Sequence, residues 1–290
     1  MDASGRMPFR DLVALFRIKK PVGTVLLFLP CLWGLILGYE CFPPVLDLIL
    51  FGVGAFCMRS AGCAYNDWVD RNIDGKVSRT KARPLAVRRV SVFQALVPVS
   101  FFLCVALGVL LSLRGYAVQI GLIVAPAILP YPWLKRFANW PQLYLGFLFG
   151  SGLLMAFAHA SPAGFPFPLG IWFFYGAGAL WTLYYDTLYA YQDRHDDMKM
   201  GLGSTAVFFK DKPHEFLVFL VILILSLLGL GGIWCDLQGG FFMGLLGVGL
   251  HFSWQLRTLD LKRPKTFGQT FLSNQWTGLL IVLCFLLGVT

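Results

Sequence analysis

Residues 216–234 read FLVFLVILILSLLGLGGIW and contain no charged side chain. An α-helix needs roughly 20 consecutive apolar residues to cross the hydrocarbon core of a bilayer. Transmembrane β-strands are shorter, about 10 residues, and alternate apolar with polar side chains. This stretch shows no such alternation, so it predicts a transmembrane helix.

The same pattern recurs along the whole chain. Of its 290 residues, 57% are hydrophobic and 13% are charged, and the mean hydropathy is +0.69, whereas a soluble domain carries about 25% charged residues. We predict an all-α polytopic membrane protein with nine transmembrane helices, folded as one domain over residues 1–290. The nine segments are residues 21–39, 46–64, 92–113, 116–131, 142–160, 168–187, 216–234, 239–256 and 272–289.

The basic residues predict how the chain is oriented in the membrane. All but two of the 24 Lys and Arg lie in the N-terminal segment and in alternate loops; the exceptions are Arg114, in an opposite loop, and Arg59, inside the second span. Positive residues mark cytoplasmic loops, so we predict a cytoplasmic N-terminus. The two longest polar connections, residues 65–91 and 186–214, then face the cytoplasm. This placement accounts for the net charge of +9 without a nucleic-acid partner.

The first twenty residues bear on the compartment. They are too short and too mixed in composition for a cleaved signal, and the Arg/Ser-rich transit pattern is weak. We therefore favour the bacterial inner (cytoplasmic) membrane, with the mitochondrial inner membrane as the alternative.

Seven of the 15 acidic residues lie in two short stretches. The first motif is NDWVDRNID (residues 66–74) and the second motif is DTLYAYQDRHDD (residues 186–197); each continues a predicted transmembrane helix at its cytoplasmic end. The residues that share a face at helical spacing are Asn66, Asp67, Asp70 and Asp74 in the first motif and Asp186, Asp193 and Asp197 in the second. Carboxylates gathered in this way repel one another unless cations lie between them.

The residue types around the motifs suit a metal and a phosphate. Mg²⁺ usually bridges carboxylates to the phosphate oxygens of a substrate, and Arg offers phosphate a planar pair of donors. The basic residues that flank the motifs are Arg79, Arg83, Lys135, Arg136, Arg194 and Lys199. The arrangement predicts a magnesium site for a lipid diphosphate. A solvated charged surface is the competing interpretation, and two motifs at equivalent helix ends weigh against it.

Further residues match a family pattern. The first motif is followed by VSRTKARPL (residues 77–85), and the second lies in YDTLYAYQDRHDDMKMGLGSTA (residues 185–206). RIKKPVGTVLLFLPCLWGL (residues 17–35) and YPWLKRFANWPQLYLG (residues 131–146) match as well. Together these stretches resemble the UbiA-type intramembrane prenyltransferases, and the second motif is most similar to the 4-hydroxybenzoate polyprenyltransferase branch.

The resemblance implies a central intramembrane cavity and a reaction. A polyprenyl diphosphate would lie between the two motifs, and the ring carbon ortho to the hydroxyl of 4-hydroxybenzoate would attack the allylic cation, in ubiquinone biosynthesis. The Mg²⁺ ligands would be Asp67, Asp70, Asp74, Asp186, Asp193 and Asp197. The catalytic residues would be Asp70, Asp193, Arg79 and Arg83.

The resemblance also implies contacts for the two substrates. The candidate substrate-binding residues are Arg59, Asn66, Lys135, Arg136, Tyr185, Tyr189, Arg194 and Lys199. Arg59 is the expected anchor for the carboxylate of the aromatic acid, because an isolated charge in a span is costly; an interhelical ion pair is the alternative. The tyrosines would shield the cation with their ring faces, although ordinary packing accounts for them equally well. The chain departs from the family pattern at His195, where an acid is common, and at Gly203, where Lys is common.

Two other functions remain open at this stage. A cation-coupled transporter would place acids deep within several spans, whereas these acids lie at the helix ends beside arginines. A prenyltransferase of the same family with another acceptor, naphthoate or haem, is the second alternative. The form of the second motif argues against haem.

Overall fold

The computed structural model describes residues 7–161 and 164–289, and over these ranges its regular structure is entirely helical. The helices are α1 (Phe9–Leu15), α2 (Val22–Tyr39), α3 (Val45–Val69), α4 (Arg71–Asp74), α5 (Val92–Ser112), α6 (Ala117–Ala127), α7 (Tyr131–Leu134), α8 (Pro141–Ala160), α9 (Leu169–Tyr191), α10 (Arg194–Met200), α11 (Thr205–Phe208), α12 (Pro213–Trp234), α13 (Gly239–Thr258) and α14 (Pro264–Val289).

Eight of the nine predicted membrane segments coincide with one helix each, and the fourth, residues 116–131, covers α6, a turn and the start of α7. In the described part of the chain, seven segments are long and apolar enough to cross a membrane by length and composition. The other two predicted segments fall on α9 and α13, which have 23 and 20 residues. The number of nine crossings and the cytoplasmic N-terminus therefore stay predictions.

The fourth segment differs most from expectation, because its helix is interrupted. α6 ends at Ala127 and is followed by a turn and by the four-residue α7. Pro126 and Pro130 lie in this region, and a proline has no N–H for the helical hydrogen bond. The break turns the chain into α7, whose C-cap residue Lys135 reaches the first motif.

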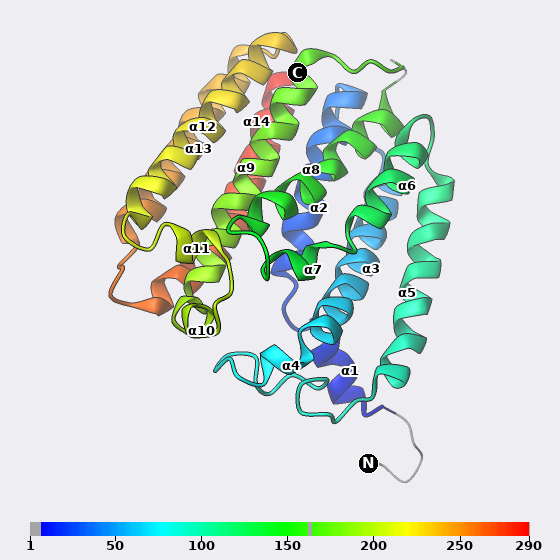
Figure 1. The fold of residues 1–290 in the computed structure, drawn as a ribbon. Helices are drawn as coiled ribbons and strands as arrows, with labels where there is room; N and C mark the ends of the chain where they lie inside the picture. Colours follow the sequence, from blue (N-terminus) through cyan, green and yellow to red (C-terminus); the bar gives the residue numbers. More distant parts are fainter. Residues whose placement is uncertain (1–6, 162–163, 290) are drawn as a thin grey trace.

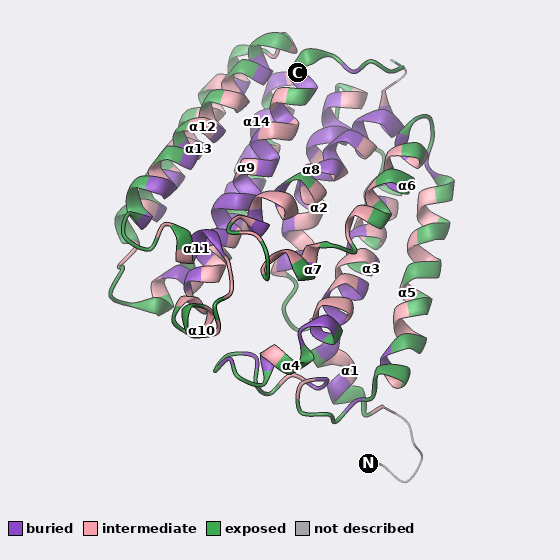
Figure 2. Ribbon diagram, in the orientation of Figure 1, coloured by how far each residue is buried: buried purple, intermediate pink, exposed green. Residues whose placement is uncertain are grey.

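The long helices form a bundle with a buried centre and an exposed edge. α2 packs against α8, α8 against α9 and α9 against α12, while α14 covers α2 and α9. Figure 2 shows α8 and α9 largely buried, whereas α5 is exposed along much of its length at the edge beside α3. An apolar exposed face is what a helix presents to lipid.

Small residues bring the central helices into close contact. A Cβ atom at Gly34 of α2 would collide with the backbone oxygen of Leu153 in α8, and one at Gly146 of α8 would collide with that of Ala179 in α9. Helices in membranes associate through such close backbone approach, because lipid offers no hydrophobic drive to hold them together. The positions of α2, α8 and α9 relative to one another are thereby fixed.

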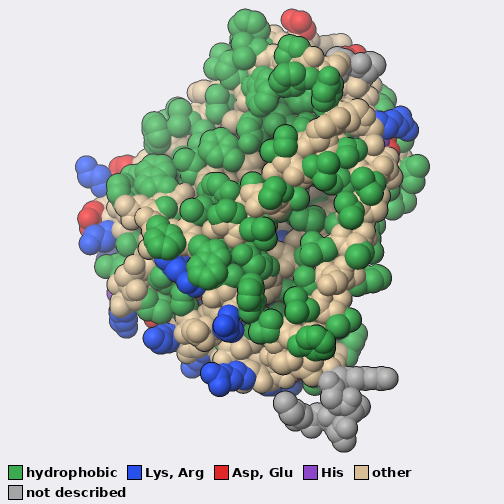
Figure 3. Space-filling model, turned by 45° about the vertical axis from the view of Figure 1, so that its right-hand side comes forward, with side chains coloured by type: hydrophobic (Ala, Val, Ile, Leu, Met, Phe, Trp, Pro, Cys, Tyr) green, Lys and Arg blue, Asp and Glu red, His purple; other side chains and the backbone are tan. Residues whose placement is uncertain are grey.

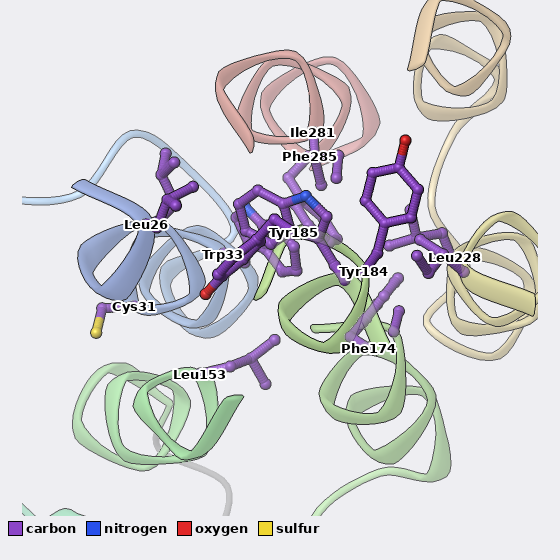
Figure 4. Packing of buried hydrophobic residues seen from close by; sticks show 14 of the residues in the cluster. Leu26, Cys31, Trp33, Leu153, Phe174, Tyr184, Tyr185, Leu228, Ile281 and Phe285 are labelled. Carbon is purple, nitrogen blue, oxygen red and sulfur yellow. The ribbon is translucent and has the colours of Figure 1, made fainter. Parts of the chain in front are cut away.

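Aromatic side chains fill the space between these helices (Figure 4). The rings of Trp33 and Trp181 stack with centroids 5.3 Å apart, and Phe285 of α14 lies 5.9 Å from Trp33. Trp181 donates from its indole nitrogen to Asn274 Oδ1 at 3.0 Å, so α14 holds the outer side of this stack.

The two motifs lie at the same end of the bundle. In Figure 1, α1, α4 and α10 are together at the lower end, and α14 terminates at the opposite end. The space-filling view shows hydrophobic side chains over most of the drawn face, with most of its Lys and Arg toward the lower half (Figure 3). This is the distribution expected of a membrane protein with a basic, polar end.

A separate polar cluster links α2, α3 and α8 away from the motifs. The Tyr39 hydroxyl donates to Asp47 Oδ2 at 2.6 Å, and His159 Nε2 lies 3.2 Å from Asp47 Oδ1. Asp47 and His159 are both buried. The cluster supplies partners for a carboxylate that would otherwise be costly inside the bundle.

Candidate functional site

The first motif begins on α3 and turns out of it at Asp70. The Asp70 N–H still donates to Asn66 O at 2.9 Å, but the chain then starts α4 at Arg71. The single helical face expected for the acids is therefore divided into two. Asp67 and Asp74 face Arg83, whereas Asp70 faces Lys135.

Asp67 and Asp74 share one guanidinium group. Arg83 Nη1 lies 2.9 Å from Asp67 Oδ1 and 2.8 Å from Asp74 Oδ2. Arg17 donates from Nη2 to both oxygens of Asp67, at 2.7 and 2.9 Å. Both carboxylates are buried, and paired, hydrogen-bonded cations are what make a buried carboxylate tolerable.

Asp70 is a buried acid, and one of its carboxylate oxygens is free of hydrogen bonds within the described chain. The ammonium group of Lys135 contacts its Oδ2, and Asn66 donates to the same oxygen at 3.2 Å. Its Oδ1 lies 3.8 Å from Arg136 Nη2, beyond hydrogen-bonding distance, and has no hydrogen-bond partner among the described residues. Burial raises the pKa of Asp70 above its usual range, although Lys135 opposes the rise.

In the second motif, Asp193 is paired with Arg79 of the first loop. Arg79 donates from Nε to Asp193 Oδ1 at 2.8 Å and from Nη2 to the other carboxylate oxygen. The guanidinium lies over the ring of Tyr189, 4.3 Å from its centroid, and also donates to the Tyr189 hydroxyl. The Ser78 N–H donates to Asp196 Oδ2 at 3.0 Å. Segment 78–79 is thus fastened to the second motif.

The second motif does not form one face either, because the helix is broken within it. α9 ends at Tyr191 and α10 begins at Arg194, so Asp186 and Asp197 lie on different helices. Burial raises the pKa of Asp197 to about 6, and the neighbouring Asp193 adds to the rise. A carboxyl group with such a pKa lies close to a low-dielectric surface or to other acids.

Arg59 lies on the inner side of the site. Its Nε is buried and has no hydrogen-bond partner among the described residues, and a Cβ atom at Gly23 of α2 would collide with its guanidinium group. Asp186, Tyr131 and Tyr189 lie within its electrostatic range. A cation with an unsatisfied donor among aromatic rings can bind an anion.

The carboxylates of the two motifs are the kind of ligand that a hard divalent cation prefers, although they do not point at one common position. Among residues 7–161 and 164–289, no three His, Cys, Asp or Glu side chains stand in metal-binding positions. The side chains of arginine and lysine neutralise the carboxylates in place of a metal ion. The free Oδ1 of Asp70 and the oxygen-only chemistry of the surrounding acids are suited to Mg²⁺.

Three predicted substrate contacts, Arg194, Lys199 and Tyr185, are not among the described residues that pair with the carboxylates. Arg194 is placed over the ring of Tyr191 at 5.5 Å, and Lys199 is exposed in the last turn of α10. Tyr185 is buried, donates to Thr182 Oγ1 at 3.1 Å and meets Trp181 edge-on. None of these contacts involves a carboxylate of the two motifs.

The structure also adds residues to the site. Arg17 donates to Asp67, and the Ser78 N–H donates to Asp196. No spacing rule points to either pair, because 50 and 118 residues separate the partners. Only the neighbourhood of α1, α3 and α10 in the fold brings them together.

Gly203 contacts the chain that precedes α8. Its N–H donates to Lys135 O at 2.8 Å, and a Cβ atom on it would collide with the backbone of Ala138. The departure from the family pattern at this position is therefore accompanied by close backbone packing. His195, the other departure, is exposed at the start of α10.

Comparison with protein families gives a match over most of the chain. Residues 27–279 match the family model of the UbiA prenyltransferase family. The human mitochondrial 4-hydroxybenzoate polyprenyltransferase is 39% identical over 293 residues, which cover 99% of this chain and 77% of that protein. The 4-hydroxybenzoate octaprenyltransferase of Psychromonas ingrahamii is 40% identical and is covered to 95%, as is this chain.

Solved structures share the fold. A UbiA homologue from Aeropyrum pernix, in its apo form, superposes with a TM-score of 0.75 at 26% identity, covering 89% of this chain and 94% of that one. A UbiA homologue from Archaeoglobus fulgidus bound to GPP and Mg²⁺ superposes with a TM-score of 0.63 at 18% identity, covering 94% and 99%.

Proposed function

The chain belongs to the UbiA prenyltransferase family, and we propose that it transfers a polyprenyl group from polyprenyl diphosphate to the carbon ortho to the hydroxyl of 4-hydroxybenzoate. Diphosphate is the leaving group, and the product is the prenylated aromatic acid of ubiquinone biosynthesis. The relatives named for this reaction at 36–40% identity support the choice of acceptor.

One observation carries the proposal: the two motifs meet at one end of the bundle. Arg79 of the loop that follows the first motif pairs with Asp193 of the second, 114 residues further along the chain. Acids and bases from both motifs therefore lie at one end of the bundle, beside apolar helices. This combination suits a substrate with a charged diphosphate head and a hydrocarbon tail.

We propose that Asp70, Asp74, Asp193 and Asp197 hold the divalent metal, which we take to be Mg²⁺. When bound, Mg²⁺ neutralises the charge that develops on the leaving diphosphate. Arg79 and Lys135 would move from carboxylate partners to phosphate oxygens, and Arg83 would donate to the diphosphate from its place beside Asp74, so that all three stabilise the same charge. The Asp186 side chain lies deeper, near Arg59, so we place it at the border of the metal site.

Arg59 would hold the carboxylate of the aromatic acid, since its buried Nε lacks a partner among the described residues. The allylic C–O bond breaks with its electron pair on the diphosphate, and the ortho carbon forms the new C–C bond. Loss of the ring proton then restores aromaticity. Tyr131 and Tyr189, which lie near Arg59, would face the cation with their rings, and the apolar surroundings exclude water that would quench it.

We propose that the polyprenyl tail runs along α2 toward an apolar groove. A groove of about 310 Å³ opens between α2, α3 and α14 and is lined by residues that include Phe28, Leu32 and Val282. Phe28 follows Gly23, which packs on Arg59, by about 8 Å along the helix at 1.5 Å per residue. A tail that leaves the site in this direction reaches lipid.

The proposal also covers the domain organisation, the topology and the membrane in which the chain lies. We infer one domain over residues 1–290, a cytoplasmic position for both motifs, and a central cavity among nine crossings. Bacterial and mitochondrial relatives are both known, and we favour the bacterial inner membrane, with the mitochondrial inner membrane as the alternative.

The test uses the purified protein in lipid nanodiscs with Mg²⁺, 4-hydroxybenzoate and polyprenyl diphosphates of several lengths. Mass spectrometry should detect the ortho-prenylated acid and its loss on chelation of the metal. A parallel reaction with a hydroxynaphthoate acceptor should give little product. If folded protein yields no prenylated 4-hydroxybenzoate at any chain length, the proposed function is wrong.

A further inference from the structure

Asp67 differs from the other acids of the first motif in that guanidinium groups occupy both of its oxygens. Arg17 binds Oδ1 at 2.7 Å and Oδ2 at 2.9 Å, and Arg83 adds a contact to Oδ1 at 2.9 Å. The side chain of Asp67 is 1% exposed. Its charge is therefore neutralised by the protein itself, and from two directions.

Asp70 provides the contrast within the same motif. Its Oδ1 is buried and has no hydrogen-bond partner in the described part of the chain, while its Oδ2 contacts one lysine. A metal needs a carboxylate oxygen that is not already committed to other donors. By this criterion Asp70 is equipped to bind a cation and Asp67 is not. Asp193 also has a guanidinium group on both oxygens, but it faces one arginine and is 15% exposed, so a metal can reach it, whereas Asp67 is enclosed between two arginines.

Arg17 connects Asp67 to the first helix. It directly follows the C-cap residue of α1, Phe16, and adopts a left-handed backbone conformation with φ 57°. Non-glycine residues keep this conformation only where their surroundings enforce it. Its Nη1 donates back to Ala14 O at 2.6 Å while Nη2 holds Asp67, so one side chain joins the end of α1 to α3.

The packing beneath this link is apolar. Leu15 and Phe16 are buried in a small cluster with Ala64 of α3 and Leu85 and Val90 of the loop that follows α4. The loop that carries Arg83 thus lies against α1. Asp67 contacts Arg83 of this loop and also Arg17, which follows α1. Loss of its charge would leave two guanidinium groups facing each other without an anion.

We propose that Asp67 is a positioning residue and not a metal ligand: it docks α1 through Arg17 and fixes Arg83 beside Asp74 for the diphosphate. This replaces the expectation that all three aspartates of the first motif bind the metal. The inference rests on the proposed function in so far as Arg83 is taken to contact a diphosphate.

The test compares Asp67→Asn with Asp70→Asn in nanodiscs, using Mn²⁺ alone, without diphosphate, as the probe and electron paramagnetic resonance as the readout. Loss of a ligand in Asp70→Asn should weaken Mn²⁺ binding by about tenfold or more, whereas Asp67→Asn should change it by less than about threefold. In turnover assays Asp67→Asn should still lower kcat by about tenfold or more.

Hydrogen exchange gives a readout that is independent of activity. Amides of residues 9–16 should exchange faster in Asp67→Asn and in Arg17→Gln, and at the wild-type rate in Asp70→Asn. The double variant Asp67→Asn/Arg17→Gln should show no larger effect on kcat than the stronger single variant, because both remove one shared interaction. Arg71→Gln is the matched control, since Arg71 is exposed on α4 and contacts the Trp68 backbone.

Two results would overturn the inference that Asp67 is a positioning residue. Equal loss of Mn²⁺ affinity in Asp67→Asn and Asp70→Asn would make Asp67 a metal ligand and overturn the inference, as would unchanged exchange in residues 9–16. If Asp67→Asn does not fold, Arg17→Gln carries the same expectations for exchange, Mn²⁺ binding and kcat. A wild-type protein without prenylation activity would contradict the proposed function alone, because the exchange and Mn²⁺ measurements remain interpretable.

Discussion

Arg79 Nε lies 2.8 Å from Asp193 Oδ1, and this contact joins segments that are 114 residues apart. Lys135 and Asp70 form a similar contact. In both pairs a side-chain cation occupies a carboxylate that we assign to the metal. Binding of the metal and the diphosphate would therefore exchange partners: the carboxylates gain the metal, and the basic groups gain phosphate oxygens.

Replacement of Arg79 should affect metal binding and diphosphate binding in opposite directions. In Arg79→Gln, Asp193 loses its internal cation, so we expect Mn²⁺ to bind several-fold more tightly in the absence of diphosphate. Turnover should fall by about 100-fold, because a donor to the leaving group is lost. Mn²⁺ titration and product formation measure the two effects. A loss of Mn²⁺ affinity together with activity would contradict the exchange.

The metal ligands should be distinguishable from other acids of the chain. We expect Asp70→Ala and Asp193→Ala to abolish turnover, because each removes a ligand and leaves the partner cation, Lys135 or Arg79, without its carboxylate. Asp236→Ala, at the turn after α12, serves as the control and should retain activity. Similar activity in all three variants would mean that the metal lies elsewhere.

Arg59 should affect one substrate and spare the other. Arg59→Gln removes the charge that we assign to the acceptor carboxylate, so the KM for 4-hydroxybenzoate should rise by about 10- to 100-fold. The KM for polyprenyl diphosphate should stay within about twofold of the wild-type value by the same argument. Steady-state kinetics with each substrate varied in turn provides the measurement, and an equal rise in both KM values would count against the assignment.

Metal binding should depend on pH through Asp197. Its pKa is raised to about 6, and a metal ligand must be deprotonated. The carboxylate is ionised above pH 6 and becomes protonated as the pH falls through 6, so Mn²⁺ affinity should decrease below that value. The titration is best made without diphosphate, whose own protonation would contribute. Asp197→Asn should bind Mn²⁺ more weakly and lose part of the pH dependence.

The close contact between α2 and α8 should matter for stability. In Gly34→Val the new side chain would collide with the backbone of Leu153, and we expect the melting temperature in detergent to fall by several degrees, since overpacking costs about 1–3 kcal/mol. Gly108→Ala in α5 is the matched control, because a Cβ atom there has no neighbour within 4 Å. A stable Gly34→Val variant would show that the two helices can move apart.

The sequence predicted the helices well because apolar length alone requires them. Segment 216–234, for example, falls within α12, and segment 46–64 within α3. The ends of these helices were less predictable. α3 turns at Asp70 and α9 stops at Tyr191, so neither motif keeps the single face that helical spacing had suggested.

The sequence could not predict which acid pairs with which basic residue. The acids and the basic residues were both recognisable as groups, but spacing along a chain does not tell which helix ends are neighbours. Arg17 illustrates this: it lies outside every predicted span, and its partner Asp67 is 50 residues away. The short α1 that presents it was not predicted, since it has only seven residues.

The contact of Gly203 with the segment that follows Lys135 restricts how this chain can diverge from its relatives. A lysine at position 203, the common residue in the family pattern, has no room for its Cβ atom beside Ala138. A lysine there would require a shift of the neighbouring backbone, which lies in the same segment as Lys135, the partner of Asp70. We therefore expect a chimaera that exchanges one of the two segments without the other to be less active than either parent.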